Sequence, residues 1–145
     1  MKKLFTFILM SGLVAFASSC GSSKELNSLS AIGGEWDVVE INGTSVEPVE
    51  DQTSAFIGFD VQKKLVYGSA GCNRLTGGLN ADAKAGTIDF GAMACTRMMC
   101  KDMKTEDMLL EALGKVTNYK VNGDGSMTLG NDSSKSLVVL KKRAK

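Results

Sequence analysis

From residue 33 onward, the chain consists mainly of short segments in which apolar and polar residues alternate, separated by turns rich in glycine and asparagine. Alternation with a period of two is typical of strands that bury one face, and Asn-Gly pairs are typical of tight turns between antiparallel strands. In the first segment, Trp36 and Val38 lie on one face, and Ile41 is expected on the other. The expected strands are 34–41, 55–60, 64–71, 75–81, 86–93, 118–121, 126–130 and 136–141.

One stretch, residues 105–113 (TEDMLLEAL), has the period of an amphipathic helix instead. Thr105 can cap its start and Gly114 can end it. Its apolar stripe needs a sheet to lie on, whereas its acids are expected to face water. We therefore predict a mainly β fold with one helix (α+β): a curled antiparallel sheet or partly open barrel with a single amphipathic helix packed across it. The stripe comprises Met108, Leu109, Ala112 and Leu113, and the acids are Glu106, Asp107 and Glu111.

The first 19 residues have the layout of a secretory signal peptide, because Lys2 and Lys3 precede an apolar run from Leu4 to Phe16 that small residues follow. A helix over that run is about 20 Å long, too short for a hydrocarbon core of about 30 Å. The small residues 17–19 directly before Cys20 resemble a bacterial lipobox. The alternative is an ordinary cleaved signal peptide followed by an incidental cysteine.

By resemblance to bacterial lipoproteins, Cys20 would carry a diacylglycerol on its thiol and a further acyl chain, such as palmitate, on its freed amine. Two or more acyl chains anchor a protein stably to a membrane. We therefore expect a lipid-anchored protein of the bacterial cell envelope, located at the outer membrane on either its periplasmic or its surface side. A tether over residues 20–31 would lead to one folded domain over residues 32–142.

Loss of Lys2 and Lys3 would leave 15 basic residues against 16 acidic ones, so the side-chain charge of the mature chain is about −1. A near-neutral, interspersed surface offers no electrostatic basis for binding nucleic acid. We expect a monomer. The closing residues 141–145, KKRAK, form either a solvated tail or a contact with a membrane surface.

The sequence contains no histidine, which excludes Ser/His/Asp and Cys/His nucleophiles and imidazole-based zinc sites. Residues 71–78, GCNRLTGG, have the glycines of a phosphate loop but lack the lysine and hydroxyl that follow them in such loops. We therefore expect neither an enzyme nor a bound cofactor or metal.

With Cys20 assigned to lipid, Cys72, Cys95 and Cys100 remain, an odd number in an oxidising compartment. One disulfide and one free thiol is the simplest outcome. A bridge from Cys72 to Cys100 would stabilise the fold by about 3–4 kcal/mol in the chain-entropy model. A bridge from Cys72 to Cys95 is nearly as favourable, so the residues alone leave the pairing open.

Two motifs, GSAGCNRLTGG at 68–78 and TRMMC at 96–100, stand between an opening GEWDVVEING and a helix that contains Glu106. This combination resembles the META domain, a family that includes the heat-shock-linked HslJ lipoproteins, over about residues 32–142. The resemblance implies a curled antiparallel sheet with a helix. It also implies a disulfide between Cys72 and Cys100, with Cys95 as an addition in this chain.

Asn73, Arg74, Thr96 and Arg97 complete the two motifs. Asparagine tolerates a positive φ and can bond its own backbone, and either arginine can bridge carbonyls across the two motif loops. Two interpretations stay open, a patch that contacts a ligand and a structural corner whose residues bond one another.

Residues 93–103 are rich in sulfur, and thiolate and thioether ligands suit Cu(I). Against a copper site, methionine is a common core filler, and neighbouring methionines point to opposite faces of an extended chain. A free thiol at Cys95 could alternatively serve in thiol exchange. The copper ligands would be Met93, Cys95, Met98, Met99, Cys100 and Met103.

The leading hypothesis is a non-enzymatic, envelope-anchored module for binding or stress response. Its partner would be a hydrophobic small molecule, such as a lipid held between sheet and helix, or an envelope protein.

Overall fold

The computed structural model describes residues 29–144. The predicted signal peptide, the lipidation site Cys20 and most of the tether lie outside the described residues. The strands are β1 (Gly34–Ile41), β2 (Thr44–Ser45), β3 (Phe56–Asp60), β4 (Leu65–Ser69), β5 (Arg74–Gly78), β6 (Asn80–Asp82), β7 (Thr87–Asp89), β8 (Ala94–Cys95), β9 (Asn118–Val121), β10 (Ser126–Gly130) and β11 (Val138–Lys142), and helix α2 (Lys104–Leu113) lies between β8 and β9. Every predicted strand overlaps an observed one, and the predicted segment 75–81 overlaps both β5 and β6.

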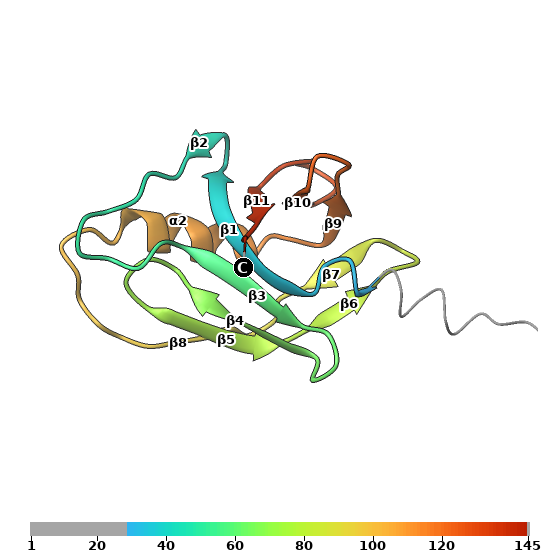
Figure 1. Cartoon of the computed structure of the whole chain (residues 1–145), viewed down its shortest axis with the longest axis horizontal. Helices are drawn as coiled ribbons and strands as arrows, with labels where there is room; N and C mark the ends of the chain where they lie inside the picture. Colours follow the sequence, from blue (N-terminus) through green and yellow to red (C-terminus); the bar gives the residue numbers. More distant parts are fainter. Residues whose placement is uncertain (1–28, 145) are drawn as a thin grey trace, which may run out of the picture.

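The strands form one antiparallel sheet in the order β6-β7-β9-β10-β11-β1-β3-β4-β5-β8, with β2 paired to β1 alone. β5 and β6 follow each other in the chain, separated only by Leu79, yet they lie near opposite ends of this order. The sheet must therefore curl until its ends approach each other, and Figure 1 shows the resulting half-open barrel with α2 across it. The predicted fold class is confirmed.

Strand β1 changes its alternation at a β-bulge between Val38 and Glu40. Val38 pairs with Leu140 and Glu40 pairs with Val139, so one residue of β1 has no partner in β11. Because the extra residue shifts the side-chain alternation by one position, Ile41 turns to the same buried face as Trp36 and Val38. The prediction that Ile41 lies on the opposite face is therefore wrong.

Helix α2 buries Leu109, Ala112 and Leu113 against the inside of the curled sheet. Burial of each leucine contributes about 1.5–3 kcal/mol, and the helix closes a core that includes Trp36, Ile57, Phe59, Ile88, Met127, Leu129 and Leu140. The start of the helix is not capped by Thr105 as predicted. The N-cap residue is Met103, which makes no side-chain capping bond, and Asp102 Oδ1, one residue earlier, accepts the Lys104 N–H at 2.8 Å.

Lys142 and Arg143, close to the end of the described residues, contact other parts of the fold. Lys142 in β11 donates to the Gly33 carbonyl and lies over the Trp36 ring, with its Nζ 4.3 Å from the ring centroid. Arg143 pairs with Glu35 and Asp37 and lies over Phe56. The hydrogen bond to Asp37, followed by the contacts with Glu35, raises the pKa of the Arg143 guanidinium. Lys142 and Arg143, two of the residues predicted as a solvated tail or membrane contact, therefore fasten β11 to β1.

The described chain begins at one end of the molecule, and the loop between β8 and α2 lies at the other end of its long axis (Figure 1). Within residues 29–144, no helix is both long and apolar enough to cross a bilayer.

Candidate functional site

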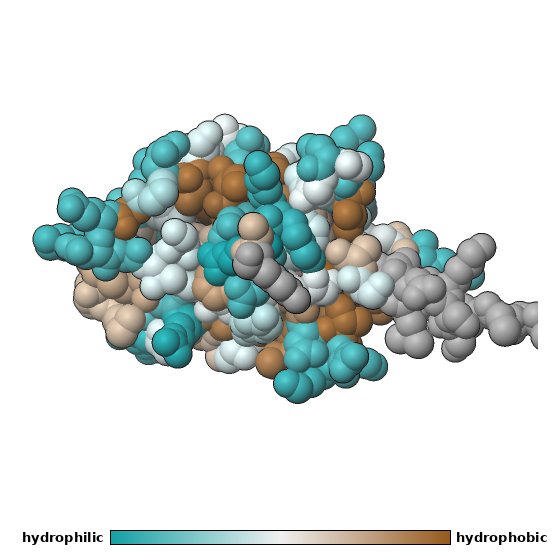
Figure 2. Space-filling view, in the orientation of Figure 1, coloured by the Kyte–Doolittle hydropathy of each residue, from teal (hydrophilic) through white to brown (hydrophobic). Residues whose placement is uncertain are grey.

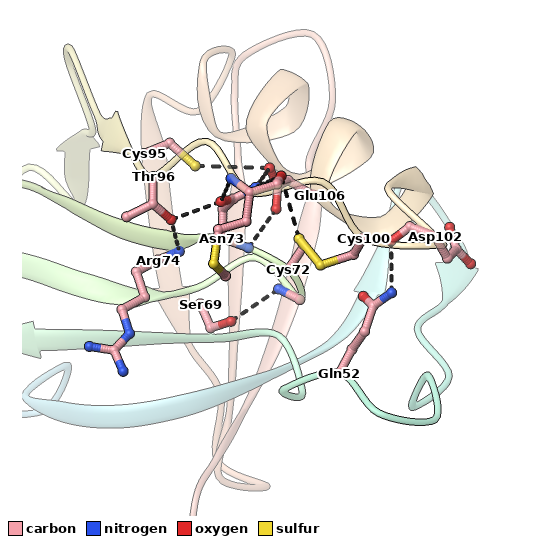
Figure 3. The surroundings of a disulfide bond; sticks show 12 residues. Gln52, Ser69, Cys72, Asn73, Arg74, Cys95, Thr96, Cys100, Asp102 and Glu106 are labelled. Carbon is pink, nitrogen blue, oxygen red and sulfur yellow. Dashed lines mark hydrogen bonds between the residues drawn. A yellow bond between two sulfur atoms is a disulfide. The ribbon is translucent and has the colours of Figure 1, made fainter.

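The two sequence motifs meet at the disulfide between Cys72 and Cys100, whose Cα atoms are 5.9 Å apart. Cys72 lies in the turn between β4 and β5, and Cys100 lies in the loop between β8 and α2 (Figure 3). The turn requires glycine at Gly71, where φ is +114°. The structure thus contains the bridge that the resemblance implies, and it leaves Cys95 as a free thiol.

The two motif loops, joined by the disulfide, form a corner of the fold with the start of α2. Asn73 is the centre of this corner, and it is only 1% exposed. Its Nδ2 donates to Glu106 Oε1 at 2.8 Å and to the Met98 carbonyl at 3.0 Å. Its Oδ1 accepts the Thr96 hydroxyl at 2.8 Å and the Met98 N–H at 2.7 Å. The side chain does not serve a positive φ, as the sequence suggested, because Asn73 is not among the described residues with that conformation. Instead it joins helix α2 and the second motif loop to the first motif.

Glu106 supplies the helix side of the corner and is 5% exposed. Its Oε2 accepts the Asn73 N–H at 2.8 Å, so the two carboxylate oxygens hold both the backbone and the side chain of Asn73. The prediction that Glu106 faces water is wrong. Its position three residues before Leu109 places it on the apolar stripe of α2, which is the signal that could have identified it.

Thr96 and Arg74 join β5 to the second motif loop through the main chain. The Arg74 N–H donates to Thr96 Oγ1 and the Thr96 N–H donates to the Arg74 carbonyl, both at 3.1 Å. Asn73, and not the side chain of Arg74 or Arg97, bridges the two motif loops. Neither Arg74 nor Arg97 has a side-chain hydrogen bond or ion pair with any residue in 29–144, and Figure 3 shows Arg74 pointing away from the corner.

Cys95, in β8, is half-buried, and its Sγ lies 4.0 Å from Glu106 Oε1. Burial, with a smaller contribution from the Glu106 charge, raises the pKa of the Cys95 thiol. A raised pKa lowers the thiolate fraction at neutral pH, and the thiolate is the reactive species. This environment is the opposite of the one that activates a cysteine for thiol exchange.

The sulfur atoms considered as copper ligands do not share one environment. Cys100 is in the disulfide and supplies no thiolate while the bridge is intact. Met98 and Met99 are 55% and 90% exposed, whereas Met93 lies against Gly77. Within the described part of the chain, no group of three or more histidine, cysteine or acidic residues could hold a metal.

A surface hollow of about 750 Å³ lies beside the corner, over β4, β5 and β8. The rings of Phe56 and Tyr67 and the side chain of Met98 contribute apolar surface to it, and Arg74 and Thr96 contribute polar groups. Figure 2 shows apolar surface, in pale brown, at the end of the molecule where the loop before α2 lies. A hollow of this size is within the range of ligand sites.

Comparisons with known proteins agree with this geometry. The model of the family described as the META domain matches residues 27–144. Among curated proteins, none matches this chain.

Three solved structures share the fold. An NMR structure of a protein from Burkholderia xenovorans is 18% identical, with a TM-score of 0.61 over 97% of this chain and all (100%) of that one. A second NMR structure is 23% identical, with a TM-score of 0.58 over 76% of this chain and 89% of its own. The crystal structure of a DUF4847 family protein from Bacteroides vulgatus is 18% identical, with a TM-score of 0.54 over 79% of this chain and 95% of its own.

Proposed function

The chain belongs to the META domain family, and on that premise we propose that it is a lipid-anchored, non-enzymatic binding module of the bacterial cell envelope. The anchor would be Cys20, since the signal-like segment and the small residues before this cysteine match a lipobox. The eight residues from 21 to 28 would then span at most about 30 Å between the lipid and the described domain.

The observation that carries the binding role is the way Asn73 fixes the loop before α2. Asn73 bonds both the N–H and the carbonyl of Met98, and the disulfide holds the same loop at Cys100. The side chains of Arg97, Met98 and Met99 remain exposed on this fixed backbone. A loop that is already ordered loses little conformational entropy when a partner binds, which favours recognition.

The position of the corner supports the same role. Because the corner and the start of the described chain lie at opposite ends of the long axis, an anchored domain can present the corner away from its membrane (Figure 1). We propose an envelope protein as the partner and, following the resemblance to heat-shock-linked lipoproteins, a link to envelope stress.

Site-specific photo-crosslinking in growing cells tests this function. A photoreactive amino acid replaces Met99 in the full-length chain, and the matched control carries it at Lys120, which is exposed on β9. We expect a discrete crosslinked product from position 99 and none from position 120. Identical products from both positions, or none from position 99, would refute a binding role for the corner.

Metabolic labelling with a clickable fatty acid tests the anchor separately. We expect the wild-type chain to be labelled and to fractionate with membranes, and we expect Cys20→Ala to lose both properties. An unlabelled wild-type chain in the soluble periplasmic fraction would refute the lipid anchor.

A further inference from the structure

The hollow over β4, β5 and β8 carries a single charge. Of the residues that line it, only Arg74 is charged, and its guanidinium has no hydrogen bond or ion pair within residues 29–144. Glu106, which contacts the lining residue Cys95, is bound to Asn73. Glu35 and Asp37 are bound to Arg143. The hollow therefore has an unmatched positive charge beside apolar surface.

The remaining lining suits a ligand that is apolar next to its charge. Phe56 and Tyr67 provide ring surface, Met98 provides a flexible apolar wall, and Thr76 and Thr96 provide hydroxyls. Thr96 is held in place, because its hydroxyl donates to Asn73 and accepts the Arg74 N–H. A guanidinium binds a carboxylate through charge-assisted, often bidentate hydrogen bonds.

The edge of the sheet beside the hollow favours a polypeptide. β8 is the last strand in the sheet order and pairs only with β5 among the described strands. Successive residues of an antiparallel strand direct their main-chain groups alternately toward and away from the neighbouring strand. Thr96 directs its N–H toward the Arg74 carbonyl, so the preceding residue, Cys95, directs its N–H and carbonyl away from β5. An extended peptide can use such free main-chain groups.

We propose that this hollow binds an extended, acidic segment of a partner protein, with one carboxylate on Arg74 and neighbouring apolar side chains against Phe56, Tyr67 and Met98. The inference rests on the proposed binding function and specifies its ligand. In this proposal, the two motifs hold Thr96 and Met98 in position beside Arg74.

Methionine-methyl NMR of the full-length, disulfide-intact chain in phosphatidylcholine nanodiscs tests the proposal. Met98 lines the hollow, whereas Met99 is 90% exposed and does not, so the two methyl groups form an internal comparison. The probes are a blocked pentapeptide with one glutamate between two apolar residues and the same peptide with glutamine. We expect the acidic peptide to shift the Met98 methyl resonance while Met99 stays unchanged, and the glutamine peptide to bind about tenfold more weakly.

Arg74→Gln should weaken binding of the acidic peptide about tenfold and leave the glutamine peptide unaffected, because only one of them uses the guanidinium. Arg97→Gln is the matched control, since Arg97 is also exposed but does not line the hollow. Equal effects of the two variants, or equal affinities of the two peptides, would overturn the proposal.

Nanodiscs containing phosphatidylglycerol distinguish a lipid from a peptide. A shift of Met98 caused by this lipid without peptide would identify a membrane headgroup as the occupant and overturn the proposal. If position 99 crosslinks a partner in cells but neither peptide binds, this inference fails and the proposed function stands. If the acidic peptide binds through Arg74 but no partner is crosslinked, the ligand site stands and the proposed function fails.

Discussion

Replacement of Glu106 by glutamine tests the bonded corner without changing its volume. The two carboxylate oxygens of Glu106 accept two donors of Asn73, the backbone N–H and Nδ2, each at 2.8 Å. Glutamine offers one oxygen and one NH₂ group, so in either orientation of the amide one donor of Asn73 faces another donor. Glu106→Gln therefore removes one hydrogen bond and leaves one buried N–H group unpaired.

The size of the effect follows from burial. A hydrogen bond to a charged group contributes about 1.5–3 kcal/mol, and a buried donor without a partner costs about 1–3 kcal/mol. Water cannot replace the lost acceptor readily, because Glu106 and Asn73 are only 5% and 1% exposed. The neutral glutamine is easier to bury than the carboxylate, which offsets part of the loss. We expect the free energy of unfolding to fall by about 2–4 kcal/mol.

Urea unfolding of the oxidised protein measures this change. The chain has one tryptophan, Trp36, which is 2% exposed, so its fluorescence reports loss of the core. Glu111→Gln is the control on the same helix. Its carboxylate is exposed and, among the described residues, pairs with Lys115, so we expect the free energy of unfolding to stay close to that of the wild type.

A free energy of unfolding for Glu106→Gln within about 0.5 kcal/mol of the wild type, or an equal loss in Glu111→Gln, would contradict this expectation. Either result would mean that the hydrogen bonds between helix and motif do not stabilise the fold.

Three further predictions concern other parts of the chain. Reduction of the disulfide should lower the free energy of unfolding by about 3–4 kcal/mol, from the 28-residue separation of its cysteines, and urea titrations with and without reductant measure the difference. Alkylation of Cys95 in the folded chain should be slower at neutral pH than that of a free cysteine and should accelerate as pH rises through its raised pKa, as mass spectrometry would follow; equal rates would contradict the burial of this thiol. Gly68→Ala should lower the thermal midpoint by several degrees, because its Cβ would lie too close to the backbone of β3, whereas Gly78→Ala, with nothing within 4 Å of its Cβ, should leave the midpoint nearly unchanged.

Local patterns were sufficient for most of the sheet. Alternation identified the strands, and the Asn42–Gly43 pair identified the first hairpin, where φ is 49° and 78°. The bulge in β1 was not predictable from alternation, because it depends on the register against β11. The two-residue strand β8 was missed, since Thr96 holds it to β5 through bonds that no local pattern records.

The candidate site depended still more on distant contacts. The cysteine pairing was left open by the residues themselves and needed the family resemblance. Glu106 looks like a solvated acid when only polarity is considered, yet its partner Asn73 is 33 positions away in the chain. Arg143 likewise finds its carboxylates across 106 and 108 positions. Such pairs form only when the sheet has curled.

The disulfide closes a covalent ring that contains both margins of the sheet. The residues between Cys72 and Cys100 contain β5, β6, β7 and β8, which are the outermost strands at both ends of the strand order. Once oxidised, the chain therefore keeps both exposed margins within one covalent ring, even when the rest of the barrel opens. Unpaired margins are where β-proteins add foreign strands and aggregate. Newly made chains would accordingly be most vulnerable to association in the interval before oxidation.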